Sequence, residues 1–315
     1  MFYKNEEGYI VLLKDALKGE TKNTRNGEVL SQFGHMIEFD NISKSFPLIT
    51  TKKVFFRGIV EELLWFLRGS TNANELKDKK VNIWNGNSSR GYLDSIGLSN
   101  YTEGELGPVY GWQWRKFGKQ YIASKEQKVA CDIDNNFNFI EKPDYINRGY
   151  DQLKFVLTEL LKDNNSRRAV LSAWNPCDLN KMALPPCHIL YIFNKTNEGL
   201  CCHLTLRSSD LFLGLPFNIA SCALLTIIIA HVLHINVSKI CLSICDAHIY
   251  IEHIEQVKKQ IELEIYNPPK VVINKSPPHI DSSIEEKIEW IEQLSYEDFE
   301  LINYKSHDRL NALMK

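Results

Sequence analysis

Apolar residues recur at helical spacing in four stretches of the chain. Positions three and four apart lie on one face of a helix, so each stretch predicts an amphipathic helix with one buried side. Gly19 predicts the end of the first helix, and the spacing of Ser282 and Glu285 predicts a capping box before the last. The apolar positions are Tyr9, Leu12, Leu13 and Leu17; Val60, Leu63, Leu64 and Leu67; Leu153, Val156, Leu157, Leu160 and Leu161; and Ile284, Ile288 and Ile291.

Short runs rich in β-branched and aromatic residues, bounded by polar turns, predict strands. Helices and strands are interleaved, which favours an α/β (α+β) fold with a mixed antiparallel and parallel sheet and packed helices. No linker divides the chain, so we predict one domain over residues 1–315, with a polar surface insertion at 118–147. The predicted strands are Val170–Trp174, Ile189–Phe193, Cys202–Arg207, Ile240–Ile244 and Val271–Asn274.

The most apolar stretch, Ile219 to Ile235, is interrupted by Ser221, Thr226, His231 and His234. Its length and these polar residues favour a buried helix over a membrane span. The amino end carries charge where a signal peptide needs an apolar core. We therefore expect no membrane association.

Composition narrows the class of protein further. Of 315 residues, 44% are hydrophobic and 24% charged, which is typical of a packed globular chain and argues against disorder. Lys and Arg total 37 against 39 for Asp and Glu, so no basic surplus exists to follow a nucleic acid. Eight cysteines without CxxC pairs indicate reduced thiols, and we expect a cytoplasmic protein.

Cys187 has the most unusual setting of these cysteines, within Ala183-Leu-Pro-Pro-Cys-His188. Two prolines fix the approach to the thiol and remove two backbone donors. A buried structural thiol is the ordinary interpretation, because most buried cysteines are inert. A rigidly presented nucleophile is the alternative.

Arg207 ends the alternating strand Cys202–Arg207, whose period of two places His203, Thr205 and Arg207 on one face. A permanently charged guanidinium on a sheet face needs an anionic partner. That partner is either Asp210, three residues on, or a bound phosphate. In the second case the same site also helps to hold Cys187 as a thiolate.

Three further stretches place polar groups where a ligand can use them. Asn218 heads the long apolar helix, where its amide either caps the helix or pairs with the edge of a planar base. Alternation places Asp246, His248 and Tyr250 on one side of a strand, without a convincing third ligand for a metal. Residues 166–168, Ser-Arg-Arg, form either a surface charge pair or an anion site.

Six long blocks, in order and spanning about Gly8 to Tyr304, carry a resemblance to a known family. They read FPLITTKKVFFRGIVEELLWFLRGSTN, LGPVYGWQWRKFG, SRRAVLSAWNP, MALPPCH, RSSDLFLGLPFNIAS and DAHIYIEHIE. The chain thereby resembles thymidylate synthases, which methylate dUMP. The resemblance implies the thymidylate synthase fold, a sheet-to-sheet homodimer, no metal, and 5,10-methylenetetrahydrofolate as the co-substrate.

The resemblance also implies how the reaction proceeds. Cys187 corresponds to the nucleophile that adds to C6 of uracil, after which C5 attacks the folate methylene group. Elimination and hydride transfer then give dTMP and dihydrofolate. Glu62 corresponds to the carboxylate that organises waters and proton movement, and Tyr110 to a tyrosine tied to those waters.

Ligand roles follow from the same matched motifs. Arg207 and Ser208 correspond to phosphate ligands, and Arg167 and Arg168 to a pair donated across the dimer interface. Asn218 corresponds to the residue that reads uracil N3–H and O4, and His248 and Tyr250 to the pair that holds the 3′-hydroxyl. Asp210, grouped with the dUMP and folate ligands, corresponds to the acid that hydrogen-bonds the pterin. The folate pocket residues are Trp84, Leu211, Gly214 and Phe217.

Several positions depart from the family pattern. Leu206 replaces a usual Gln and Thr205 a usual Tyr, which is expected to slow the chemistry without abolishing it. Arg25 stands one position later than the phosphate arginine of the usual Arg-Thr-Gly loop. Tyr304 matches the family, but Met314-Lys315 replaces the apolar end that closes over folate, so closure is expected to be less efficient.

Two other functions are alternatives to the synthase. One is a dUMP hydroxymethylase on the same scaffold, in which water instead of hydride ends the reaction. The other is a catalytically idle paralogue that binds nucleotide or RNA, which has no need for an activated thiol.

Overall fold

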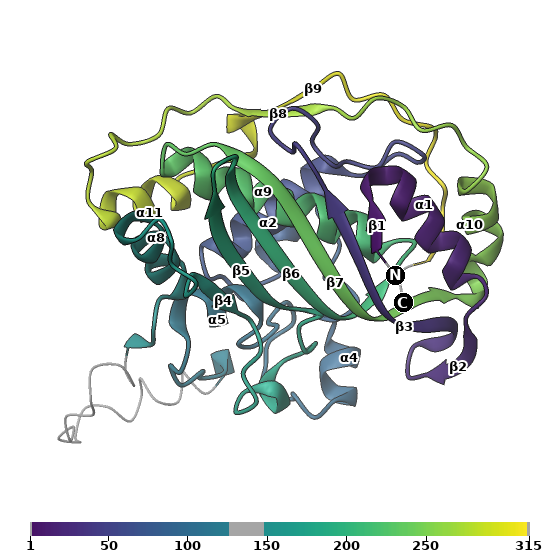
Figure 1. The fold of residues 1–315 in the computed structure, drawn as a ribbon. Helices are drawn as coiled ribbons and strands as arrows, with labels where there is room; N and C mark the ends of the chain where they lie inside the picture. The colour runs from purple at the N-terminus through teal and green to yellow at the C-terminus, as the bar shows by residue number, and fades with distance from the viewer. Residues whose placement is uncertain (1, 126–147, 314–315) are drawn as a thin grey trace. The chain divides into compact units, whose positions relative to one another are not determined.

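A computed structural model of the chain describes residues 2–125 and 148–313 (Figure 1). Most of the predicted polar insertion, and the departure at Met314-Lys315, lie outside these residues. The described residues fall into two compact units. Of these residues, the first unit comprises 2–60, 157–170 and 187–313, and the second comprises 61–125, 148–156 and 171–186.

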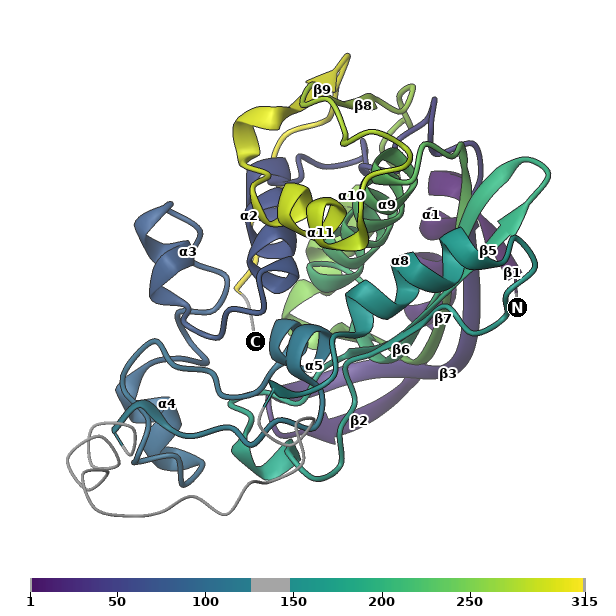
Figure 2. The ribbon, with the colours of Figure 1, turned by 90° about the vertical axis from the view of Figure 1, so that its left-hand side faces the viewer.

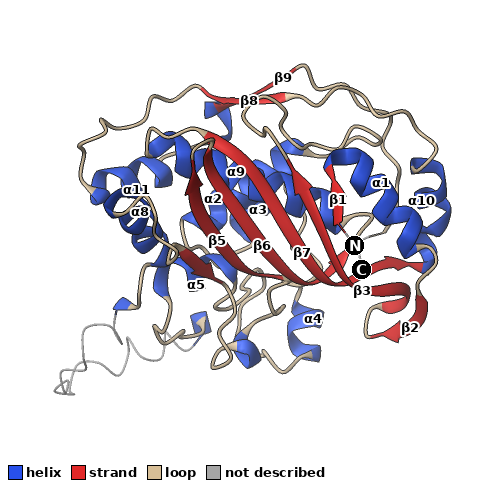
Figure 3. Ribbon diagram, viewed as in Figure 1, coloured by secondary structure: helices blue, strands red, loops and turns tan. Residues whose placement is uncertain are grey.

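The first unit is built on a mixed sheet with the strand order β1-β3-β7-β6-β5-β4, to which β2 adds by pairing with β3 (Figure 3). The β6–β7 and β1–β3 pairs are parallel, whereas β2–β3, β3–β7 and β5–β6 are antiparallel. The mixed sheet is therefore confirmed. The strands are β1 (Phe2–Lys4), β2 (Glu20–Thr24), β3 (Gly27–Phe39), β4 (Val170–Ser172, beginning in this unit), β5 (His188–Thr196), β6 (Gly199–Asp210) and β7 (Val237–Tyr250).

Helix α9 (Gly214–Val232) forms the centre of this unit's core, against one face of the sheet (Figures 1 and 2). It is long and apolar enough to cross a membrane, but 78% of its most apolar window is buried inside the protein. The buried-helix prediction is thus confirmed. Leu204 and Leu206 of β6 are fully buried on the covered face of the sheet.

The remaining elements of the first unit lie around this core. A two-stranded antiparallel sheet joins segments 270–273 and 299–302. These elements are α1 (Asn5–Ala16), the start of α2 (Phe56–Leu67), the end of α8 (Gln152–Lys162), α10 (Ile254–Gln260), α11 (Ile284–Glu292), β8 (Lys270–Ile273) and β9 (Phe299–Ile302).

The capping box of α11 lies one residue later in the chain than predicted. Ser283 caps α11: its hydroxyl accepts from Glu286 N at 3.2 Å, and Glu286 Oε2 accepts from Ser283 N at 2.7 Å. The pairs Ser282/Glu285 and Ser283/Glu286 have the same spacing, so the motif alone does not choose between them. The first residue of α11 decides the register.

The second unit is mainly helical and surrounds a cluster of aromatic rings. Phe66 stacks on Tyr110 with ring centroids 4.8 Å apart and meets Trp114 edge-on at 5.6 Å. Buried hydrogen bonds of 3.0–3.1 Å join the segment 171–186 to α5 (Tyr110–Lys116). They connect the side chains of Gln113, Asn175 and Asp178. The unit contains the rest of α2 and α8, with α3 (Asn74–Asp78), α4 (Arg90–Ser95) and α5 (Tyr110–Lys116).

Candidate active site

Cys187 lies immediately before β5, beside Arg207 of the neighbouring strand β6. The backbone N–H of Arg207 donates to the carbonyl of Cys187 at 2.9 Å, and its guanidinium Nη2 donates to the Cys187 sulfur at 3.6 Å. Burial raises the pKa of the Cys187 thiol, and the guanidinium charge opposes this by lowering it. The structure thus places next to Cys187 the cation that a thiolate needs.

His188 follows Cys187 in sequence but is not an activating imidazolium. Its Nδ1 lies 2.9 Å from the Tyr191 hydroxyl, and the ring is buried. Burial lowers the pKa of His188 to about 3, so the ring is neutral at physiological pH. The charge beside the thiol therefore comes from Arg207.

Asn218 lies in the first turns of α9. Leu213 is the N-cap residue and no side chain caps this helix, so the capping interpretation of Asn218 is wrong. Within residues 2–125 and 148–313, the half-buried amide of Asn218 has no hydrogen-bond partner. Its donor and acceptor remain available to a planar ligand.

His248 and Tyr250 lie together at the end of β7, with ring centroids 5.3 Å apart. His248 Nδ1 lies 2.8 Å from Asp246 Oδ1, as the predicted alternation requires. Burial raises the pKa of Tyr250, while a hydrogen bond with Asn26 and the charge of Arg25 lower it. The β2–β3 turn, which carries Arg25, therefore lies close to Tyr250.

Asp210 ends β6 and accepts a hydrogen bond from the backbone N–H of Phe212 at 2.9 Å. The next predicted folate residue, Leu211, has its carbonyl bound by the buried Tyr9 hydroxyl at 2.9 Å. Gly214 and the half-buried Phe217 follow in the first turn of α9. The end of β6 and the start of α9 thus bring these predicted residues together with Asn218.

Glu62 and Trp84 form a separate cluster in the second unit. Trp84 Nε1 donates to Glu62 Oε1 at 2.8 Å, and the Trp84 ring meets that of Tyr110 edge-on at 5.8 Å. Burial raises the pKa of Glu62 to about 7, while the bond from Trp84 lowers it. A carboxyl group that titrates near neutral pH is suited to proton transfer.

Comparison with known proteins identifies the family. A model of the family described as thymidylate synthase matches residues 7–315. The chain belongs to the thymidylate synthase family. It is 42% identical over 297 residues to the human thymidylate synthase, covering 94% of this chain and 86% of that protein.

Two further relatives are bifunctional dihydrofolate reductase-thymidylate synthases. The one from Paramecium tetraurelia is 45% identical over 98% of this chain, and the one from Zea mays 42% identical over 98%. The chain spans 61% and 54% of their respective lengths.

Two further arginines of this thymidylate synthase family member were predicted to bind phosphate. Arg167 and Arg168 precede β4 and are exposed. Ser166, just before them, is buried and donates to Glu159 at 2.8 Å, which anchors the backbone of this segment. Within the described ranges no ion pair is formed by either guanidinium.

Two of the departures from the family pattern, Thr205 and Leu206, lie on opposite faces of β6. Leu206 is fully buried on the core side, and Thr205 is half-buried on the other side, next to Arg207 in the alternation. An amide side chain at position 206 would need partners inside this core. The structure therefore gives Leu206 a packing role.

Lys52 and His253 lie within the quoted family blocks, but the sequence predicted no role for either, and both lie near Asp210. Burial lowers the pKa of Lys52 to about 7, and its ammonium lies 3.6 Å from the centre of the Phe212 ring. His253 is 1% exposed, donates from Nε2 to the Leu313 carbonyl at 2.8 Å, and has its Nδ1 4.0 Å from Asp210. Neither stands out in sequence, because burial of a polar side chain is visible only in the fold.

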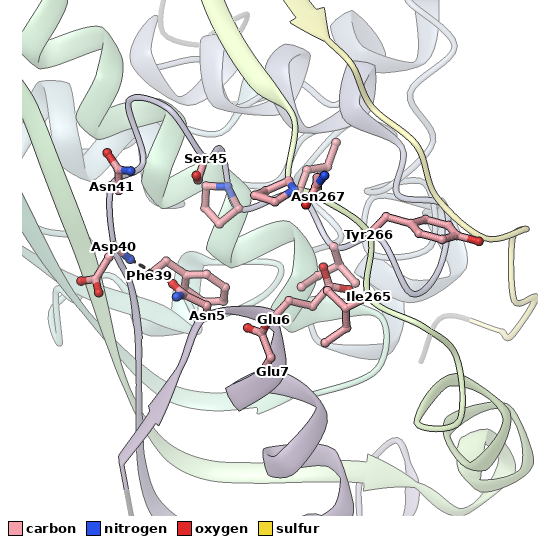
Figure 4. Close-up of a pocket in the computed structure, with 14 residues that line it drawn as sticks. Asn5, Glu6, Glu7, Phe39, Asp40, Asn41, Ser45, Ile265, Tyr266 and Asn267 are labelled. Atoms are coloured by element: carbon pink, nitrogen blue, oxygen red, sulfur yellow. Dashed lines mark hydrogen bonds between the residues drawn. The ribbon is translucent and has the colours of Figure 1, made fainter.

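A cavity of about 340 Å³ lies elsewhere in the first unit (Figure 4). Its lining includes Glu6 and Glu7 of α1, Asp40 after β3, and Tyr266. Glu6 accepts hydrogen bonds from Thr50 and Thr51, so its carboxylate is occupied by the backbone. None of the predicted site residues lines this cavity. Among the described residues, no cluster of three His, Cys, Asp or Glu side chains could hold a metal.

Proposed function

We propose that the protein is a thymidylate synthase that converts dUMP and 5,10-methylenetetrahydrofolate to dTMP and dihydrofolate. The observation that carries this proposal is the Arg207 guanidinium 3.6 Å from the Cys187 sulfur. It supports a thiolate that can add to C6 of the uracil ring. Family membership agrees with this chemistry, as does the position of Asn218 in the first turns of the helix that follows Asp210.

The proposed roles divide between binding and proton transfer. Arg207, with Ser208, Arg25, Arg167 and Arg168, binds the phosphate, because guanidinium forks match its oxygens. Asn218 pairs with uracil N3–H and O4, and His248 and Tyr250 hold the 3′-hydroxyl.

The co-substrate 5,10-methylenetetrahydrofolate supplies the one-carbon group and the hydride. Asp210 accepts a hydrogen bond from its pterin ring, and Trp84, Leu211, Gly214 and Phe217 line its site. Glu62, with Tyr110, moves protons through ordered water near O4. Because the family model matches residues 7–315 without interruption, we also propose one catalytic domain over residues 1–315. A cytoplasmic location stays a prediction.

A spectroscopic assay tests the proposal against its closest alternative. Mixing the protein with dUMP and methylenetetrahydrofolate should release dihydrofolate, which is followed by its absorbance. A hydroxymethylase would form product nucleotide without dihydrofolate, and an idle paralogue would form neither.

Cys187→Ser tests the nucleophile. A hydroxyl is not ionised near neutral pH, so turnover should fall by at least about 10³-fold while dUMP still binds. Cys177→Ser, at an exposed cysteine, is the matched control and should keep full activity. With 5-fluoro-dUMP and 5,10-methylenetetrahydrofolate, mass spectrometry should find a covalent adduct on Cys187, because fluorine at C5 cannot leave as a proton does. An adduct on another cysteine would contradict the assignment.

A sheet-to-sheet homodimer completes the proposal. On the sheet face opposite α9, Phe33 is 79% and Ile192 is 36% exposed, and within the described part of the first unit no helix covers this face (Figure 3). Covering such apolar side chains favours association with a second copy. Arg167 and Arg168 would then reach the partner's phosphate site.

Mixed dimers test this arrangement. A double Arg167→Ala, Arg168→Ala variant and Cys187→Ser should each be nearly inactive alone. Under exchanging conditions, mixing them should restore up to about a quarter of the wild-type activity, since half the dimers are mixed and each carries one intact site. No restoration would argue against a shared site.

A further inference from the structure

A chain of hydrogen bonds runs from the β2–β3 hairpin to His248. Lys22 Nζ donates to Ser31 Oγ at 3.2 Å, and Ser31 Oγ donates to Asp246 Oδ2 at 2.9 Å. The other oxygen of Asp246 lies 2.8 Å from His248 Nδ1. Ser31 and His248 are directly opposite in the β3–β7 register, so the pairing of the two strands sets this alignment (Figure 1).

The direction of the bonds determines where the His248 proton lies. An ionised carboxylate only accepts hydrogen bonds, so the His248 nitrogen bonded to Asp246 must carry a proton. In the neutral ring, Nε2 is then an acceptor. Within residues 2–125 and 148–313, no side chain is bonded to His248 Nε2.

Asp246 is in turn held by two neighbouring side chains. Ser31 is 2% exposed, and Lys22 Nζ lies 3.9 Å from Asp246 Oδ2, so a cation and a buried hydroxyl hold the same carboxylate oxygen. These contacts leave Oδ1 directed at the imidazole. The same hairpin also contacts Tyr250 through the side-chain hydrogen bond of Asn26.

We propose that Asp246, held by Ser31 and Lys22, is a positioning residue that keeps the proton on His248 Nδ1 and presents Nε2 as an acceptor to the sugar 3′-hydroxyl. The inference rests on the proposed function, because it concerns how dUMP is read. A nucleotide without a 3′-hydroxyl cannot donate to Nε2 and leaves a polar group unpaired. The β2–β3 hairpin thus contributes to sugar specificity through Asp246, which orients His248 and does not itself touch the sugar.

The readout is the ratio of kcat/KM for dUMP to that for 2′,3′-dideoxy-UMP. One lost hydrogen bond corresponds to a preference of roughly tenfold in the wild type. Asp246→Ala should reduce this ratio about fivefold, because the ring is no longer held in one tautomer. Asp246→Asn should stay within about twofold of wild type, since its amide oxygen still accepts from Nδ1–H. Glu28→Ala, at an exposed residue of the same hairpin, is the control and should not change the ratio.

A second measurement reads the tautomer in the wild-type protein and does not need folded Asp246 variants. Nitrogen chemical shifts of ¹⁵N-labelled histidine in the wild-type protein, assigned with His248→Gln, should show the Nδ1–H tautomer. The Nε2–H tautomer, or an unchanged ratio in folded Asp246→Ala, would overturn the inference. Failure of the wild type to convert dUMP would instead refute the proposed function, and the tautomer would still test the role of Asp246.

Discussion

The charge of Arg207 should set the pH at which Cys187 becomes reactive. Its guanidinium nitrogen lies 3.6 Å from the sulfur. Burial raises the pKa of the Cys187 thiol, and the charge of Arg207 lowers it. Replacing Arg207 with Gln keeps a hydrogen-bonding side chain but removes the charge. The pKa of Cys187 should therefore rise further.

The size of this effect follows from Coulomb's law. At an effective dielectric constant of about 20, unit charges at this distance interact by roughly 5 kcal/mol. Arg207 is half-exposed and its charge is spread over the guanidinium, so solvent screening reduces the useful part to about 2 kcal/mol. That energy corresponds to a rise of about 1.5 pH units in the thiol pKa.

Alkylation by iodoacetamide, followed for the Cys187 peptide by mass spectrometry across pH, measures this shift. Because only the thiolate reacts, the midpoint in Arg207→Gln should move to higher pH, and the rate near pH 7 should fall by about 30-fold. Arg207→Lys retains a charge and should shift less. Arg57→Gln, at an exposed arginine elsewhere, should leave the midpoint unchanged. An unchanged midpoint in Arg207→Gln would refute the reasoning.

Two further predictions concern Glu62 and Lys287. The pKa of Glu62 is raised to about 7, so its carboxylate, the proposed proton acceptor, forms as pH rises through 7. Turnover should rise with it, and Glu62→Gln should remove this step from the kcat–pH profile; a retained step would assign it to another group. Lys287 is fully buried, and its ammonium donates to three carbonyls at 2.8–3.0 Å. Lys287→Met should lower the free energy of unfolding by about 2–4 kcal/mol. In denaturant titrations the exposed control Lys258→Met should cost less than about 0.5 kcal/mol, and equal losses would show that the buried bonds contribute little.

Four amphipathic helices, the buried helix α9 and the strands β4–β8 could be predicted from local patterns. The four apolar stripes correspond to α1, α2, α8 and α11, and the predicted strands to β4–β8. Strand β2, with the sequence Glu-Thr-Lys-Asn-Thr, has no apolar residue and is fully exposed, so alternation could not reveal it. Its pairing with β3 is a tertiary interaction.

The candidate site was predictable where a motif names a residue and unpredictable where a contact defines it. Cys187, Arg207, Asn218 and His248 follow from motifs. The sequence does not show that Asp246 bonds to His248 through one oxygen and accepts from Ser31 through the other, because Ser31 lies 215 residues away. It likewise leaves open whether Asn218 caps its helix.

By itself, the sequence determined the family and the helices and strands with a local period, and it indicated Cys187 as the candidate nucleophile. Hydrophobic periodicity and motif order are properties of neighbouring residues, so they are readable without a fold. Only the tertiary structure decided that Glu62 titrates near neutral pH, that His188 stays neutral, and that Arg207 supplies the charge beside Cys187. These properties depend on removal from water and on distances between side chains, and folding alone establishes both.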